Sequence, residues 1–241
     1  MSQIKQIPWD NLKPIDLNKI QFIDYPNNGY IKKKSKKKQI VLHHTVSGRG
    51  YRGDIATWQK YQSRIAVHII IARDGTAYQL YNSRYWGYHL GAGDGSLDKH
   101  SIAIELDNWG PLTKNGQTVY GNYVDTEKMH YPNKFRGYEY YEYYPDLQIK
   151  TAGELILYWH KTYGIPLVYH DDMWDISGKA LNGTPGIWTH YSFRGANEKM
   201  DCHPQPSLKE MLIALKNVKN HETRCRNSIT NRCWNFCYDL Y

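Results

Sequence analysis

Two short apolar segments that each end on a histidine constrain this sequence more than any other feature. Residues 39–45 read QIVLHHT, with His43 after the apolar run, and residues 186–190 read GIWTH, which ends on His190. Short apolar runs of this kind are typical of buried strands. The second run is followed at 199–203 by KMDCH, which adds a carboxylate, a thiol and an imidazole. Zinc accepts these donor atoms in a tetrahedral site, so the two segments predict a zinc site built from distant parts of the chain.

The pattern between these segments predicts one α/β (α+β) domain over residues 39–217, with a central mixed β-sheet flanked by helices. An Asp74–Gly75 pair between two apolar runs indicates a hairpin. Asp54 is the expected N-cap of a short helix, and the tyrosine-rich stretch 110–146 is expected to be an irregular insertion. The expected strands are 40–42, 66–71, 77–81 and 101–106. The expected helices, from their apolar spacing, are 55–61, 147–163 and 208–215.

Both flanks of this domain differ from it in composition. Residues 1–38 contain three prolines and end in the lysine run KKKSKKK, which predicts a basic N-terminal arm with a solvated face. Nucleic-acid binding is not favoured, because no aromatic or arginine residue interrupts the lysines. Residues 218–241 are expected to form a packing or wall-anchoring tail. The spacing of its Cys225, Cys233 and Cys237 does not fit the usual structural zinc pairs, although a second metal site with His221 is an alternative.

Charge and composition limit the partners of the protein. The 241 residues carry a net charge of +8, which favours an anionic partner such as nucleic acid, a membrane surface or a bacterial wall. The 22 tyrosines and 8 tryptophans suit a wet surface that binds sugars or peptides. We find no apolar segment long enough to span a membrane and no hydrophobic region of a secretory signal. We therefore expect that the protein is made in the cytoplasm. We also expect a monomer.

Several segments, taken in their order along the chain, resemble the zinc amidases of the peptidoglycan-recognition and phage-lysozyme superfamily, which are N-acetylmuramoyl-L-alanine amidases. The resemblance covers about residues 39–215. It implies the fold of that family, a Zn²⁺ cofactor, and hydrolysis of the amide bond between N-acetylmuramic acid and L-alanine in peptidoglycan. The segments that carry it are IVLHHT, AVHIIIARDGT, GYHLGAG, HSIAIELDN, GIPL, GIWTH and KMDCHPQP.

The resemblance implies that His43 and His190 are zinc ligands. In the family the third ligand lies two residues after a lysine and directly before a proline. Here Asp201 has the expected spacing from Lys199, whereas His203 is the residue before proline and Cys202 lies between them. We favour Asp201 and keep the other two as alternatives. His170 competes for the second position, but it lies much further from the third ligand along the chain.

The resemblance also implies catalytic and substrate-contacting residues. Glu105 would be the general base, and Lys199 would stabilise the negative charge that develops on the substrate oxygen. Some phage members use a tyrosine where this chain has Val67, which leaves the glutamate as the base. His89 and Trp86 flank a glycine-rich loop that resembles the substrate-contacting loop of the family.

These features together predict a phage endolysin that acts on the cell wall after its release from the host cytoplasm. Its positive charge would help it to adhere to an anionic wall. The alternative is a non-catalytic peptidoglycan-binding module, since some relatives in the recognition family have lost a zinc ligand.

Overall fold

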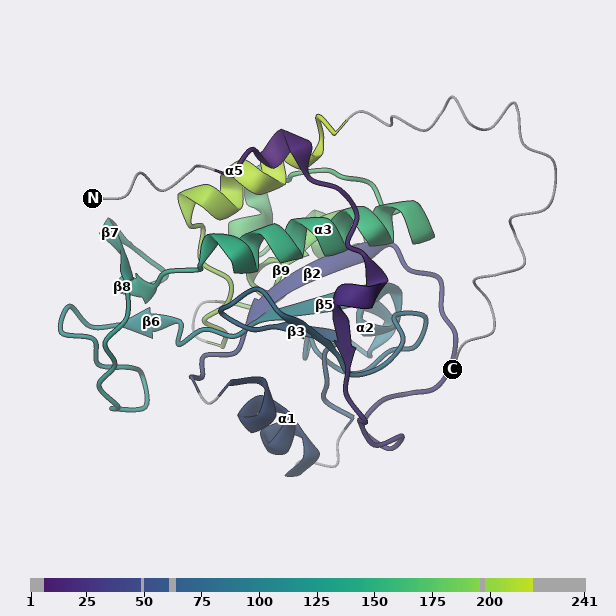
Figure 1. Ribbon diagram of the computed structural model, residues 1–241, viewed down its shortest axis with the longest axis horizontal. Helices are drawn as coiled ribbons and strands as arrows, with labels where there is room; N and C mark the ends of the chain where they lie inside the picture. Colours follow the sequence, from purple (N-terminus) through teal and green to yellow (C-terminus); the bar gives the residue numbers. More distant parts are fainter. Residues whose placement is uncertain (1–6, 49, 61–63, 196–197, 219–241) are drawn as a thin grey trace.

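The computed structural model describes residues 7–48, 50–60, 64–195 and 198–218. Within them a six-stranded sheet has the order β1-β4-β3-β5-β2-β9 and lies between helices (Figure 1). Neighbouring strands are parallel except β3 and β4, which form the predicted hairpin. This confirms the predicted mixed sheet flanked by helices. The strands are β1 (Ile20–Phe22), β2 (Gln39–His44), β3 (Ile69–Ile71), β4 (Ala77–Gln79), β5 (Ser101–Leu106) and β9 (Gly186–Thr189).

The two faces of the sheet pack against different helices, because side chains alternate along each strand. On β5, Ile102 and Ile104 belong to the larger apolar core, whereas Ala103 between them belongs to a smaller one. Helices α3 (Asp146–Tyr163) and α5 (Pro206–Leu215) contribute to the larger core. Figure 1 shows these two helices on one side of the sheet and α1 on the other. No helix in the described part of the chain combines the length and apolar character that a membrane span requires.

Helix α1 (Gly50–Lys60) begins earlier than the sequence predicts. Tyr51, Ile55 and Trp58, which have the i, i+4, i+7 spacing of one helical face, all pack against the smaller core, so the first turn is stabilised by packing. Asp54 therefore lies inside the helix and is buried, and its prediction as an N-cap is wrong. The other short helical elements are η1 (Trp9–Asn11), η2 (Leu17–Lys19), α2 (Ser96–His100), η3 (Asp171–Trp174), α4 (Gly178–Leu181) and η4 (His190–Ser192).

The stretch expected to be an irregular insertion contains a second, three-stranded antiparallel sheet. Its strands β6 (Pro111–Leu112), β7 (Lys128–Phe135) and β8 (Tyr138–Glu142) have the order β6-β8-β7. Glu142 joins this sheet to the main domain, because its carboxylate accepts hydrogen bonds at 2.9 and 2.8 Å from the guanidinium of Arg73. Tyr141 beside it is fully buried. The tyrosine cluster is therefore strand and core rather than irregular surface.

The described part of the predicted N-terminal arm is packed into the domain, so the expectation of a separate arm is wrong there. Trp9, Leu12 and Ile15 are buried in the larger core, and β1 pairs with β4 at the edge of the sheet. These apolar residues cover α3 and α5, which would otherwise expose apolar surface to water. The predicted boundary at the other end, residues 218–241, lies outside the described residues except for its first residue.

The lysine run is also not uniformly solvated. Lys37 is only 3% exposed, while the other lysines of the run are exposed. Its ammonium group donates hydrogen bonds to the carbonyl oxygens of Tyr85, Lys99 and Ser101 at 2.7, 3.1 and 3.0 Å. The three acceptors explain how a lysine can be buried at this position, because a buried ammonium group needs polar partners.

Burial lowers the pKa of Lys37 to about 7, against the opposing charge of Asp98. A lysine in the unfolded chain titrates near ~10.4, so between these values the unfolded state binds more protons than the folded state. We therefore expect the contribution of Lys37 to the free energy of unfolding to rise with pH above about 7, by at most about 1.4 kcal/mol per pH unit. Urea unfolding at several pH values should show this rise in the wild type and in the exposed control Lys36→Met. The rise should be missing in Lys37→Met, and an identical pH dependence in all three proteins would contradict the prediction.

Candidate metal centre and active site

Three neighbouring parallel strands end at the same edge of the main sheet and carry residues of the candidate site there. Strand β2 lies between β5 and β9, and His43 on β2 is in register with Glu105 on β5. His190 directly follows β9. Paired residues of parallel strands face the same side, and successive residues face opposite sides. His43 and Glu105 therefore share one face, whereas His44 faces the larger core, where its Nδ1 lies 2.5 Å from the Tyr144 hydroxyl.

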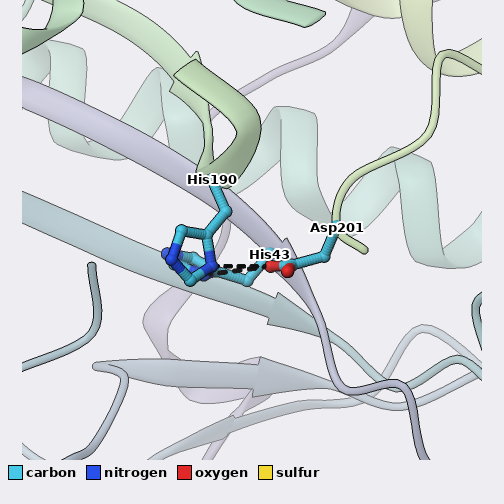
Figure 2. A group of neighbouring side chains, drawn as sticks. All are labelled: His43, His190 and Asp201. Carbon is cyan, nitrogen blue, oxygen red and sulfur yellow. Dashed lines mark hydrogen bonds and ion pairs between the residues drawn. The ribbon is translucent and has the colours of Figure 1, made fainter. Parts of the chain in front are cut away.

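Two imidazole rings and one carboxylate meet at this edge (Figure 2). His43 Nδ1 lies 2.9 Å from His190 Nδ1. Asp201 Oδ2 lies 2.9 Å from His190 Nδ1 and 3.3 Å from His43 Nδ1. All three side chains are buried, and in the described part of the chain they form the group of acidic, thiol and imidazole side chains that is compact enough to hold a metal ion. The structure thus brings together the three residues that the sequence favours.

The alternative third ligands have other partners. Cys202 Sγ lies 3.1 Å from the Tyr144 hydroxyl, and both ring nitrogens of His203 are used, by the Tyr131 hydroxyl at 2.8 Å and the Glu142 carbonyl at 3.0 Å. His170, the competitor for the second position, stacks on Trp188 with the ring centroids 4.0 Å apart. None of the three belongs to the group around His43.

The cysteines near the C-terminal end are the alternative second metal site that the sequence offers. Cys225, Cys233, Cys237 and His221 lie outside the described residues, so this alternative stays a prediction.

Each ligand histidine makes a further contact through its other ring nitrogen. His190 Nε2 lies 2.9 Å from the carbonyl oxygen of Leu90, and His43 Nε2 lies 3.0 Å from His89 Nδ1. Both contacts lie on the side of the rings away from Asp201, because they use the opposite nitrogen. The rings are therefore fixed in orientation, with Nδ1 directed toward the shared centre.

The charges in the site follow from burial and from these close contacts. Burial and the neighbouring His190 ring hold the pKa of His43 well below its usual range, although Asp201 acts in the opposite direction. Burial alone would raise the pKa of Asp201, but His190 and His43 outweigh it and hold that pKa well below the usual range. Burial raises the pKa of the Glu105 carboxyl well above its usual range; Asp201 and Asp54 raise it further and Lys199 opposes them. The site therefore combines a neutral imidazole with an ionised Asp201.

A cleft of about 540 Å³ opens over this group. Glu105 and Lys199, the two predicted catalytic residues, both line it together with the three ligand candidates. Several other lining side chains could not be predicted from the sequence, because their positions on α1 and in loops carry no local signal. These are Asp54, Trp58, Tyr88, Trp109, Tyr120 and Asn122.

The structure does not support the predicted substrate contacts of His89 and Trp86. The His89 side chain is only 1% exposed, and its two ring nitrogens contact His43 and the Ser101 hydroxyl. Although His89 borders the cleft, neither ring nitrogen is left to bind a substrate. Trp86 is not among the residues that line the cleft, whereas Tyr88, two positions later, is. The backbone of Trp86 instead pairs with that of Ile31 in an antiparallel bridge.

Comparison with known proteins assigns the chain to a family. Residues 33–204 match the family described as N-acetylmuramoyl-L-alanine amidase. No curated protein sequence matches the chain. Similar solved structures include the amidase LysC from Clostridium intestinale URNW, which is 18% identical, with a TM-score of 0.49 over 83% of this chain and 98% of that one. Others are the PlyG catalytic domain (16% identical, TM-score 0.48, 85% and 97% covered) and a selenomethionine AmpD derivative (15% identical, TM-score 0.48, 85% and 98% covered).

Proposed function

This chain belongs to the N-acetylmuramoyl-L-alanine amidase family, and from that premise we propose that it is a zinc-dependent endolysin. Its reaction would be hydrolysis of the amide bond that joins N-acetylmuramic acid to L-alanine in bacterial peptidoglycan. The observation that carries the zinc part of the proposal is the group formed by His43, His190 and Asp201 in the lining of the cleft.

The donor atoms of this group suit zinc. Because a carbonyl oxygen can only accept, the contact with Leu90 places the proton of neutral His190 on Nε2 and leaves a lone pair on Nδ1. Ligands about 2.0–2.1 Å from a tetrahedral zinc lie roughly 3.3 Å from one another. The separations of 2.9 to 3.3 Å between the three donors are close to that value. His43 and His190 would hold the ion through Nδ1 and Asp201 through a carboxylate oxygen.

Glu105 and Lys199, which also line the cleft, supply proton transfer and charge stabilisation. When bound, zinc acts as a Lewis acid that polarises a carbonyl group and makes water more acidic. The Glu105 carboxylate accepts the proton of the attacking water and passes it to the nitrogen of the leaving L-alanine. The Lys199 ammonium group stabilises the negative charge that develops on the carbonyl oxygen.

The lining of the cleft suits a glycopeptide. Its walls carry the aromatic side chains of Trp58, Tyr88, Trp109 and Tyr120. Such rings pack against sugar faces and peptide side chains while their polar atoms remain able to form hydrogen bonds. A non-catalytic binding module would need only these walls, so the added presence of three ligands with Glu105 and Lys199 favours the enzyme.

The biological setting that we propose is release from the cytoplasm of an infected cell and attack on the wall. The net charge of +8 supports this proposal, because it favours adhesion to an anionic surface.

A wall-digestion assay with chemical analysis of the products tests the proposal. We expect the purified chain to clear a suspension of cell walls and to release new amino-terminal alanine without new reducing sugar ends. A chelator should stop the reaction, and added zinc should restore it. Clearing that resists the chelator would contradict the zinc mechanism, and new reducing ends would indicate a glycosidase instead.

A further inference from the structure

One two-residue segment, His89–Leu90, contacts both ligand histidines. His89 Nδ1 lies 3.0 Å from His43 Nε2, and the carbonyl oxygen of Leu90 lies 2.9 Å from His190 Nε2. The two ligands come from strands far apart in sequence, yet consecutive residues of one loop contact them. This loop is therefore placed to orient both rings at once.

The segment is itself held by a buried carboxylate. Asp98 Oδ1 accepts hydrogen bonds from the backbone N–H groups of His89 and Leu90 at 2.7 and 2.8 Å. The Asp98 side chain is only 2% exposed. A buried carboxylate that accepts two backbone hydrogen bonds fixes the conformation of the segment, because any movement would leave buried polar groups unpaired.

The proton positions follow from the acceptors around these rings. Ser101 Oγ lies 2.8 Å from both the Leu97 carbonyl oxygen and His89 Nε2. The carbonyl can only accept, so the single hydroxyl proton goes to Leu97 and His89 donates from Nε2. His89 Nδ1 is then an acceptor, which requires a proton on His43 Nε2. His190 Nε2 carries a proton for the same reason, since it faces a carbonyl.

We propose that the His89–Leu90 segment, anchored by Asp98, keeps a proton on Nε2 of both His43 and His190. His89 and Asp98 are thus positioning residues for the metal centre and not contacts for substrate. With Nε2 occupied, Nδ1 is the atom of each ring that faces Asp201 and can bind the ion. The inference rests on the metal site of the proposed function, and it extends that site to residues that touch neither metal nor substrate.

Zinc affinity of the full chain, measured by competition with a chelator of known affinity, tests the role of His89. His89→Leu removes the acceptor for His43, and we expect zinc affinity to fall by about 10–100-fold, as is usual when an outer hydrogen-bond partner of a metal ligand is lost. His89→Gln should recover most of the affinity, because its amide oxygen can accept the same proton. The matched control is His68→Leu: His68 is as buried, and its ring bonds the Tyr85 carbonyl and the Ala103 N–H instead of a ligand. Equal zinc affinity in folded His89→Leu and His68→Leu would overturn the inference.

A second pair of variants tests the anchor. Asp98→Asn retains an oxygen that can accept both backbone N–H groups, and zinc affinity should stay within a few-fold of the wild type. Asp98→Ala removes this acceptor and should weaken zinc binding by at least as much as His89→Leu, because both rings lose their fixed partner. A folded Asp98→Ala protein with wild-type affinity would overturn the role of Asp98.

Nitrogen-15 NMR of the histidine rings separates this inference from the proposed function, because it needs no metal. In the metal-free wild type we expect a proton on Nε2 of both His43 and His190, whatever the protonation of the Nδ1 atoms beside Asp201. In His89→Leu the ring of His43 should no longer keep its proton on Nε2, while His190 does. A wild type with both Nε2 protons but no zinc affinity would remove the zinc mechanism alone. A wild type that binds zinc but lacks the Nε2 proton on His43 or His190 before binding would remove the inference alone.

Discussion

Replacing His43 or His190 by alanine is expected to abolish zinc binding and wall digestion together. Each change removes one of three ligands and leaves the carboxylate of Asp201 buried without one of its two histidine contacts. The Lewis-acid contribution of a metal to the reaction is several kcal/mol, and a loss of about 4 kcal/mol corresponds to a ~10³-fold slower reaction. Metal analysis of the purified variants and digestion of cell walls would measure the two effects.

The control for these variants is His170→Ala. His170 is the other histidine that the sequence offers for the second ligand position, but it stacks on Trp188 and does not line the cleft. This variant should retain its zinc and digest walls at close to the wild-type rate. A loss of zinc in His170→Ala, with zinc retained in His190→Ala, would reverse the assignment of the second ligand.

The second large effect is expected for Glu105→Gln, which should bind zinc as the wild type does but lose most of the rate. Glutamine has nearly the same shape as glutamate but cannot accept the proton of the attacking water. General base catalysis contributes typically 10²–10⁴-fold, so we expect a rate loss of about that size. Metal analysis and initial rates on the same preparation would separate the rate loss from any loss of metal. Normal rates in this variant would contradict the role of Glu105.

The pH dependence of the reaction gives an independent check of this role. Glu105 acts as a base only when ionised, and its pKa is raised well above the usual range by burial, Asp201 and Asp54. The rate should therefore fall as the pH decreases through a value above the ~4.3 of an ordinary glutamate. The control is Glu198→Gln. Glu198 also lines the cleft, but it is exposed and pairs with Arg194, so its loss should change the rate only a few-fold and preserve the pH profile. A pH profile in Glu105→Gln that matches the control would indicate a different base.

The main sheet apart from β1 and the two long helices α3 and α5 could be predicted from local patterns, because their residues carry the periodicity of the structure that they form. The apolar run at Ile102–Ile104 is a strand, and the Asp74–Gly75 turn joins two antiparallel strands as predicted. The packing of Trp9 and Leu12, the burial of Lys37 and the sheet containing Tyr141 could not be predicted in this way. Each of these depends on a partner distant in sequence, and a local pattern contains no information about such partners.

The same division applies to the candidate site. His43 and His190 could be identified because each ends a strand, and the carboxyl ends of neighbouring parallel strands meet at one edge of a sheet. The spacing from Lys199 favoured Asp201 but did not exclude Cys202 or His203, since three consecutive residues differ mainly in the direction of their side chains. The partners of His89, a histidine that the sequence placed at the substrate, were likewise visible only in the folded chain.

The sequence by itself determined the two strands that bring His43 and His190 to the same edge, because strand periodicity and chain order are local properties. Only the tertiary structure decided which side chain completes the metal group, which residues line the cleft, and how His89, Leu90 and Asp98 orient the ligand rings. Those decisions depend on distances of about 3 Å between atoms from different segments, at which a hydrogen bond forms or fails, and such distances are fixed only when the whole chain packs.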